Sequence, residues 1–202
     1  MCFDFVTPEK TVPEVRVGMP GQFNAENALA ALTVANLIGV SDEVLVTGLR
    51  NIRVNGRMEI VKLHPFTVLV DYAHNAVREY HPKRLVVVFG CGGNRAKDRR
   101  TSMGEIGGKK ADLSIITADN SRYEKVEDII ADIRESIVKT GGAFIEIPDR
   151  REAIFHAVQE ADPGDMIAII GKGHEDYQEI CGVRTHFLDR EVVEEALREM
   201  GE

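Results

Sequence analysis

The stretch MIAIIGKGHEDYQ (166–178) passes from five apolar residues directly into a turn crowded with glycines and charged side chains. An unbroken apolar run of this length is typical of a strand buried on both faces, as in parallel sheets that helices cover. In such sheets, ligands bind beyond the carboxyl ends of the strands. The stretch therefore predicts both the fold class and the edge of the sheet where a ligand would bind.

Five further runs of apolar residues alternate with segments of helical apolar spacing. The expected strands are 58–63, 67–71, 84–90, 113–119, 143–147 and 165–171, and the expected helices among them are 125–139 and 150–161. We expect an α/β fold with a Rossmann-like, mostly parallel sheet and helices on both faces. A polar hairpin around Gly182 and a helix capped by Asp189 complete the expected chain.

One connection in this scheme is too short. If strands 67–71 and 84–90 were neighbours, only residues 72–83 would join them, and this segment contains an X-Pro break. A parallel crossover takes at least about 10–12 residues and usually includes a helix. Either a segment is missing or the two strands connect irregularly.

Residues 1–56 differ from the rest of the chain in their sequence pattern. They contain an extended piece and two expected helices, 23–40 with Asn24 as its N-cap and 41–52. This part is too small for a core of its own, so we interpret it as the helical tail of a preceding domain. The second expected domain is 57–202.

Composition limits the possible functions. The chain has 202 residues and a formal net charge of −8, which argues against nucleic acid as a partner because phosphate binding needs a basic face. No apolar run approaches the about 20 residues of a membrane span, and the N-terminus lacks the pattern of a signal peptide. The cysteines, Cys2, Cys91 and Cys181, are odd in number and far apart, which favours a reducing cytoplasm over a disulfide framework.

Polar clusters follow four of the expected strands. They are DYAH (71–74), GCGGNR (90–95), DNSR (119–122) and GKGHE (171–175). Since the carboxyl ends of parallel strands meet at one edge, we expect the four clusters to share a single rim. Each alone has an ordinary explanation, such as a cap for Asp71, a loop position for His74 or a tight turn for the glycines. No GxxxxGK[ST] sequence occurs, so the chain has no complete phosphate loop.

A basic turn, NRAKDRR (94–100), extends the second cluster. Two interpretations stay open. The turn is either a solvated loop or, since it follows a strand and a group of glycines, a site for an anionic ligand.

Taken in order, six motifs resemble those of the Mur ligases, ATP-dependent enzymes that add amino acids to the peptidoglycan precursor. The motifs are GQFNAEN (21–27), GRME (56–59), VDYAHN (70–75), VFGCGGNR (88–95), DNSRYE (119–124) and GKGHEDYQ (171–178). The resemblance is strongest to the members that add 2,6-diaminopimelate. The family has three domains. The resemblance implies that 1–56 is the end of the central ATPase domain and that 57–202 is the C-terminal amino-acid-binding domain.

The resemblance also implies roles for individual residues. On the ATP side, Asn24 and Asn27 would lie near the base, Arg57 would face the phosphates and Asp71 would hold the ribose hydroxyls. The residues implied to bind diaminopimelate are Arg95, Asp119, Asn120, Ser121, Arg122, Gly171 and Glu175. The phosphate loop, the Mg²⁺ ligands and the UDP-sugar site would belong to segments absent from this chain. No residue is assigned a catalytic role.

These residue types suit meso-diaminopimelate, which carries two carboxylates and two ammonium groups. Arg95 and Arg122 can each form paired hydrogen bonds with a carboxylate, and Glu175 can accept from an ammonium. Lysine lacks the second carboxylate, so we favour diaminopimelate over lysine. Two features depart from the family pattern. Ser121 replaces a proline, and the helix between the DYAH segment and the next strand is largely absent.

We therefore expect the C-terminal part of a ligase that joins meso-diaminopimelate to UDP-MurNAc-L-Ala-D-Glu through an acyl phosphate, with ATP and Mg²⁺. The chain alone is expected to be inactive, and neither nucleic acid nor a membrane is an expected partner. Three alternatives stay open. They are a lysine-adding, folylpolyglutamate-type or cyanophycin-type ligase, a non-catalytic stand-alone binding module, and a truncated reading frame.

Overall fold

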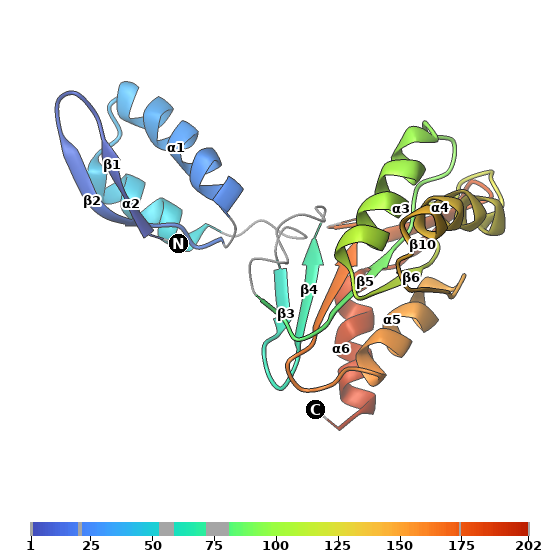
Figure 1. The fold of residues 1–202 in the computed structure, drawn as a ribbon. Coiled ribbons are helices and arrows are strands. Elements are labelled where there is room, and N and C mark those ends of the chain that lie inside the picture. The colour runs from blue at the N-terminus through green and yellow to red at the C-terminus, as the bar shows by residue number, and fades with distance from the viewer. Residues whose placement is uncertain (1, 20–21, 53–58, 72–80, 174, 202) are drawn as a thin grey trace. The chain divides into compact units, whose positions relative to one another are not determined.

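The structure is a computed structural model that describes residues 2–19, 22–52, 59–71, 81–173 and 175–201. The chain divides into two compact units, Met1–Val54 and Asn55–Glu202 (Figure 1). None of the described helices combines the length and the apolar character that a membrane span requires.

The first unit consists of an antiparallel hairpin and two helices. The strands are β1 (Cys2–Val6) and β2 (Thr11–Arg16), and the helices are α1 (Gln22–Leu37) and α2 (Asp42–Asn51). Two expectations are wrong here. The unit has its own apolar core, because Phe5 and Val15 of the hairpin region are buried together with Leu32 and Leu49 of the helices. Asn24 lies inside α1 and not at an N-cap.

The second unit is built on a six-stranded sheet in the order β3-β4-β8-β5-β6-β7. The strands are β3 (Glu59–Lys62), β4 (Thr67–Asp71), β5 (Leu85–Phe89), β6 (Leu113–Ile116), β7 (Phe144–Glu146) and β8 (Met166–Ile170). The pairing of β3 with β4 is antiparallel and the other pairings are parallel. The six predicted strands and the mostly parallel sheet are confirmed.

The apolar run that opens the stretch 166–178 forms the strand β8 inside this sheet. Ile169 lies opposite Val70 of β4 on one side and opposite Val88 of β5 on the other, and the whole strand is buried. β4 and β5 are therefore not neighbours, because β8 lies between them. Of the segment that joins them, residues 72–80 lie outside the described residues.

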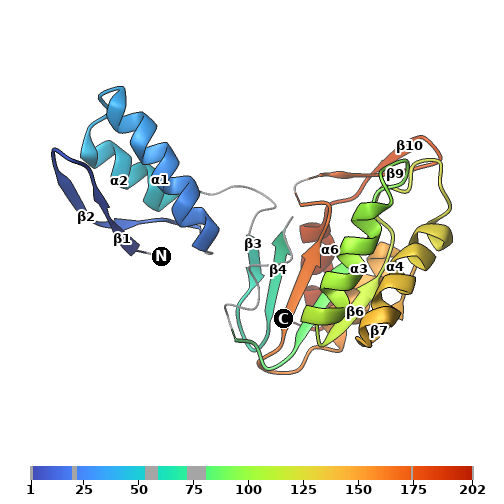
Figure 2. The same cartoon turned by 45° about the horizontal axis from the view of Figure 1, so that its top comes forward.

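Helices cover both faces of the sheet, as predicted (Figure 2). They are α3 (Asp98–Lys110), α4 (Val126–Thr140), α5 (Arg150–Gln159) and α6 (Asp189–Glu199). Ile170 of β8 packs in the apolar cluster with α3 and α4, whereas its neighbour Ile169 packs in the cluster with α5 and α6. Successive side chains of a strand point to opposite faces, so one apolar strand supplies both cores.

The sequence does not predict α3. Its segment, DRRTSMGEIGGKK, is rich in charges and glycines, a composition typical of a loop. In the structure, Met103, Gly104 and Gly107 are buried. A Cβ on Gly104 would lie only 2.6 Å from the Ile133 carbonyl oxygen, so the glycines bring α3 close to α4. The helix thus packs through its small residues and not through an apolar stripe.

The chain ends as predicted with a hairpin and a helix, but the predicted cap is wrong. The hairpin strands are β9 (Tyr177–Ile180) and β10 (Val183–His186), joined at Cys181 and Gly182. The N-cap of α6 is Leu188, and Asp189 lies in the first turn. There Asp189 is fully buried and forms an ion pair with Arg150 of α5. The carboxylate therefore joins two helices and does not cap one.

Candidate functional site

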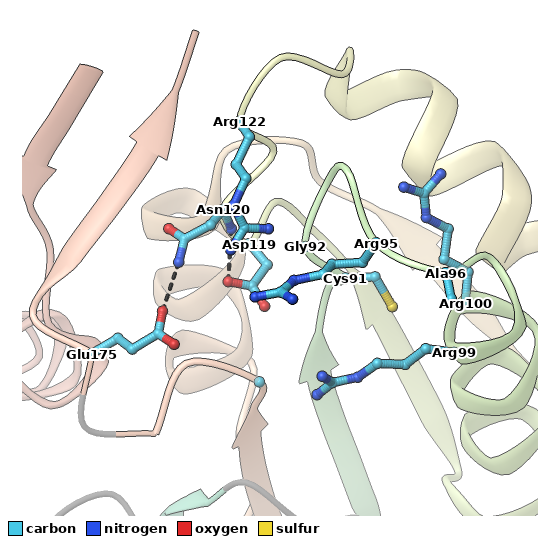
Figure 3. A pocket seen from close by; sticks show the side chains of 11 residues that line it. Cys91, Gly92, Arg95, Ala96, Arg99, Arg100, Asp119, Asn120, Arg122 and Glu175 are labelled. Atoms are coloured by element: carbon cyan, nitrogen blue, oxygen red, sulfur yellow. Dashed lines mark hydrogen bonds between the residues drawn. The ribbon is translucent and has the colours of Figure 1, made fainter. Parts of the chain in front are cut away.

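A cavity of about 420 Å³ opens at the carboxyl ends of β5, β6 and β8 (Figure 3). It is lined by Cys91, Gly92, Arg95, Ala96, Arg99, Arg100, Asp119, Asn120, Arg122, Gly171 and Glu175. Three of the four predicted polar clusters contribute to it. The fourth begins at the end of β4, and its residues 72–74 lie outside the described residues.

Six of the seven residues predicted to bind the amino acid line this cavity. They are Arg95, Asp119, Asn120, Arg122, Gly171 and Glu175. The seventh, Ser121, is buried, and its hydroxyl finds no hydrogen-bond partner in the described part of the chain. The structure thus brings the six together, while their role in binding an amino acid stays a prediction.

The loops after β5 and β6 are held against each other by their backbones. The amide of Gly93 donates to the carbonyl of Asn120 at 2.8 Å. A Cβ on Gly93 would lie 1.9 Å from the Ser121 carbonyl oxygen, so this approach requires glycine. Arg122 has a positive φ of 52°, and its amide donates to the carbonyl of Glu179 in β9 at 3.0 Å. The hairpin therefore helps to fix the arginine at the rim.

Asn120 and Glu175 are joined across the cavity by a short hydrogen bond. Nδ2 of Asn120 donates to Oε2 of Glu175 at 2.6 Å (Figure 3). The other amide atom, Oδ1, accepts from the backbone amide of Glu179 at 2.9 Å and from Nζ of Lys172 at 3.3 Å. The side chain of Asn120 is therefore fixed from two sides.

Asp119 supplies a second carboxylate. Its Oδ1 accepts from the backbone amide of Asn120 at 2.7 Å. Gly171, which follows β8, has a φ of 122°, and a Cβ there would lie 3.2 Å from Oδ2 of Asp119. Glycine at this position lets the carboxylate lie close to the end of β8.

Arginine side chains face these carboxylates. Arg95 and Arg99 are exposed and point toward the cavity in Figure 3. Within the described residues neither forms an ion pair, so their guanidinium groups can receive an anion. Nη1 of Arg122 donates to the carbonyl of Gly93 at 2.6 Å, which leaves other N–H groups of this guanidinium for a ligand. The cavity thus presents both signs of charge.

The basic turn 94–100 divides between two roles. Arg95 and Arg99 line the cavity, whereas Arg100 is buried and binds Glu124 at 2.8 Å and Asp132 at 2.9 Å. The hydrogen bond from the Asn94 amide, followed by those from Arg100, lowers the pKa of Glu124. The interpretation of the whole turn as a solvated loop is therefore wrong, since it begins α3 and ties that helix to its neighbours.

Cys91 also lines the cavity, but its environment makes it unreactive. The thiol is buried and lies 3.5 Å from the sulfur of Met103. Burial raises the pKa of Cys91 to about 12. The thiol therefore stays protonated near neutral pH and is a poor nucleophile.

Two buried cations next to the cavity are absent from the predicted set. Arg150 donates to both carboxylate oxygens of Asp189 and to the carbonyls of Ala118 and Ile170, which follow β6 and end β8. Burial opposes the charge on Arg150, but Asp189 raises the pKa of this guanidinium above its ordinary value. Lys172 is also completely buried. The sequence marks Lys172 only by its place between two glycines, and it gives no signal for Arg150.

The residues assigned to ATP fall on both units. Asn24 is buried in α1, and its Oδ1 lies 3.5 Å from Nδ2 of the exposed Asn27. Arg57 lies outside the described residues, as does the side chain of Asp71. The backbone of Asp71 ends β4, opposite Ile170. The ATP assignments stay predictions.

Comparisons with known proteins agree with the motifs. A protein-family model described as "Mur ligase, glutamate ligase domain" matches residues 56–173. The chain is 43% identical over 196 residues to the UDP-N-acetylmuramoyl-L-alanyl-D-glutamate–2,6-diaminopimelate ligase of Caldanaerobacter subterraneus subsp. tengcongensis, covering 92% of this chain and 41% of that protein. It is 42% identical over 212 residues to the ligase of the same name from Alkaliphilus metalliredigens, covering 100% of this chain and 43% of that protein.

A solved structure supports the same relationship. A structure of a UDP-N-acetylmuramoyl-L-alanyl-D-glutamate–2,6-diaminopimelate ligase superposes with a TM-score of 0.69 at 35% identity, covering 98% of this chain and 43% of that one. The chain spans about two fifths of the length of these relatives. Because the domain match covers residues 56–173, which is more than half of the chain, the chain belongs to the Mur ligase family.

Proposed function

We propose that this chain supplies the amino-acid-binding part of an ATP-dependent ligase that adds meso-diaminopimelate to UDP-MurNAc-L-Ala-D-Glu. The observation that carries the proposal is the cavity at the sheet edge, which combines the guanidinium groups of Arg95, Arg99 and Arg122 with the carboxylates of Asp119 and Glu175. The names of the relatives point to the same substrate.

The arrangement of charges suits a molecule with two carboxylates and two ammonium groups. Arginine binds a carboxylate through two parallel N–H groups, a geometry that lysine cannot reproduce. Glu175 and Asp119 can each accept from an ammonium group. The volume of about 420 Å³ lies within the range of small-molecule sites, roughly 300–1,000 Å³.

The proposed reaction requires two steps in the longer enzyme. The terminal phosphoryl group of ATP moves to one of the two free carboxylates of the D-Glu residue in the nucleotide-linked dipeptide, and ADP leaves. An amine of diaminopimelate then attacks the acyl carbon, loses a proton and displaces inorganic phosphate. The contribution of this chain is to hold the amino acid with its amine oriented toward the acyl phosphate, because orientation lowers the cost of bringing the reactants together.

ATP and Mg²⁺ belong to this proposal, as does a cytoplasmic site of action, where the nucleotide-linked precursor and ATP would both be available. We assign Asn24, Asn27, Arg57 and Asp71 to the ATP side. The phosphate loop that the chain lacks is expected in the part of the longer relatives that this chain does not cover. We therefore expect no ATP- and diaminopimelate-dependent phosphate release by the chain alone. Such release would contradict the proposal that the reaction needs a phosphate loop from outside this chain.

Other Mur-like ligases are less favoured. A lysine-adding enzyme would not need a second cationic contact, and the relatives at 42–43% identity carry names that specify diaminopimelate. These relatives are not named as folylpolyglutamate or cyanophycin ligases, so we favour those two activities less as well.

Calorimetry with the chain tests the proposal. We expect meso-diaminopimelate to bind at least about ten-fold more tightly than L-lysine, because lysine leaves one arginine without a carboxylate. In Arg122→Ala this preference should shrink toward unity. The matched control is Arg134→Ala on α4, where the arginine contacts Glu146 at 3.1 Å and does not line the cavity. Equal binding of the two amino acids by the parent chain would remove the substrate assignment.

A further inference from the structure

Lys172 is a completely buried ammonium group next to the candidate site. Its Nζ donates to Oδ1 of Asn120 at 3.3 Å and to the carbonyl of Tyr177. The same nitrogen lies 5.5 Å from the centre of the Tyr177 ring and 5.8 Å from that of Phe187. Lys172 is not among the residues that line the cavity, and these contacts are all with the protein.

We propose that Lys172 is a positioning residue that fixes the amide of Asn120 and, through it, the carboxylate of Glu175 that receives the ammonium of the amino acid. This inference rests on the proposed function of the cavity. It assigns a role in recognition to a residue that the amino acid does not touch.

The orientation of the Asn120 amide follows from its partners. The two groups that face Oδ1, the ammonium of Lys172 and the backbone amide of Glu179, can only donate hydrogen bonds. The oxygen must therefore face them, and the NH₂ group must face Oε2 of Glu175 at 2.6 Å. If the amide were reversed, its oxygen would lie against a carboxylate and its NH₂ group against two donors.

Charge balance supports the same role. Burial lowers the pKa of Lys172, while the carboxylates of Asp119, Asp189 and Glu175 favour its charged form and Arg150 opposes it. The ammonium thus partly neutralises Asp119 and Glu175, the two carboxylates of this group that line the cavity. Without it, Asn120 would lose one of its two donors and Glu175 would lose a nearby cation.

The decisive variant is Lys172→Met. Methionine keeps an unbranched side chain of similar length and removes the positive charge and the N–H donors of the ammonium group. A buried cation that served packing alone could be replaced in this way without loss of affinity. We expect affinity for meso-diaminopimelate to fall about ten-fold or more, with the fold retained by circular dichroism. The matched control is Lys139→Met on α4, whose ammonium lies in an exposed pair with Glu135. Its affinity should equal that of the parent.

A double-variant cycle separates positioning from a general structural effect. If Lys172 acts through Asn120, then Lys172→Met should have less than about a two-fold further effect in an Asn120→Ala background. Unchanged affinity in Lys172→Met, or effects that multiply in the double variant, would overturn the inference. Binding of meso-diaminopimelate to the unmodified chain is therefore measured before any variant. If the unmodified chain does not bind it, the proposed function is overturned instead.

A measurement on the unmodified chain covers the case in which Lys172→Met does not fold. With ¹⁵N-labelled lysine, saturation with meso-diaminopimelate should shift the side-chain signal of Lys172, because the ligand ammonium then binds Glu175, which the Asn120 amide joins to Lys172. The signal of Lys139 should stay in place. A Lys172 signal that does not move while the chain binds the amino acid would overturn the inference.

Discussion

Asn120 donates from Nδ2 to Oε2 of Glu175 at 2.6 Å, and this bond joins two loops that are 55 residues apart in the chain. The first loop follows β6 and the second follows β8, so the contact exists only because the parallel sheet brings both strand ends to one edge. One carboxylate oxygen of Glu175 is held by this bond. The carboxylate thus has a fixed orientation toward the cavity.

Replacing this carboxylate should weaken binding of the amino acid. In Glu175→Gln the negative charge is lost while the size of the side chain is kept, so the ammonium of meso-diaminopimelate loses a charged partner. We expect affinity to fall about ten-fold or more. Calorimetry near neutral pH measures this. Glu105→Gln on α3, whose carboxylate pairs with Lys109 in the exposed part of the helix, is the control. Similar affinities for Glu175→Gln and the parent chain would exclude Glu175 from the site.

Arg99 should contribute to selectivity for two carboxylates. It lines the cavity, is exposed and has no ion-pair partner among the described residues. We expect Arg99→Ala to weaken the binding of meso-diaminopimelate by about three- to ten-fold and the binding of L-lysine by less. The reason is that an exposed guanidinium contributes about 1 kcal/mol. The effect should decrease at high salt. Arg198→Ala on α6, also exposed, is the control. An equal loss of affinity for both amino acids would argue against a role of Arg99 in selectivity.

The sequence predicts the sheet more completely than the helices. Strands such as β8 are buried on both faces, so their apolar runs are visible without any knowledge of their neighbours. α3 depends on close backbone packing through Gly104, and a glycine gives the same signal in a loop as in a tightly packed helix. The order of the strands could not be predicted from the sequence either. β8 pairs with β4 on one side and with β5 on the other, and both of these strands are apolar.

The candidate site shows the same division. Arg95, Arg122 and Glu175 could be predicted to meet because each closely follows the end of a parallel strand. Arg150 could not, since its burial depends on Asp189, which is 39 residues away and reads in the sequence as the start of a helix. A buried ion pair needs both partners in place, and periodicity does not reveal such pairs.

Ser121 marks a position that favours an apolar side chain. Its hydroxyl is buried without a hydrogen-bond partner among the described residues, and a group in this state costs about 1–3 kcal/mol. We therefore expect Ser121→Ala to increase the free energy of unfolding by about 1 kcal/mol. Urea unfolding measures the change. Ser102→Ala, at an exposed position of α3, should change stability by no more than about 0.5 kcal/mol. Destabilisation in Ser121→Ala would show that the hydroxyl is needed.

The pair of Arg150 and Asp189 should be essential for the stability of the second unit. Both side chains are 0% exposed, and Nε and Nη2 of Arg150 lie 2.7 Å and 2.8 Å from the two carboxylate oxygens. Removing one partner leaves a buried charge without compensation, so we expect Arg150→Met to lower the free energy of unfolding by about 3–5 kcal/mol. Urea unfolding followed by circular dichroism measures this loss.

A second ion pair joins the same two helices and serves as the matched control. Arg151 of α5 contacts Glu195 of α6 at 2.6 Å, with side chains 46% and 42% exposed. Solvent screens this pair, so Arg151→Met should change stability far less than Arg150→Met. Replacing both buried partners, in Arg150→Met with Asp189→Leu, should recover part of the loss, because no unpaired charge remains. If the double variant were as unstable as Arg150→Met alone, the loss would come from the contacts of Arg150 with the carbonyls of Ala118 and Ile170 and not from the uncompensated carboxylate.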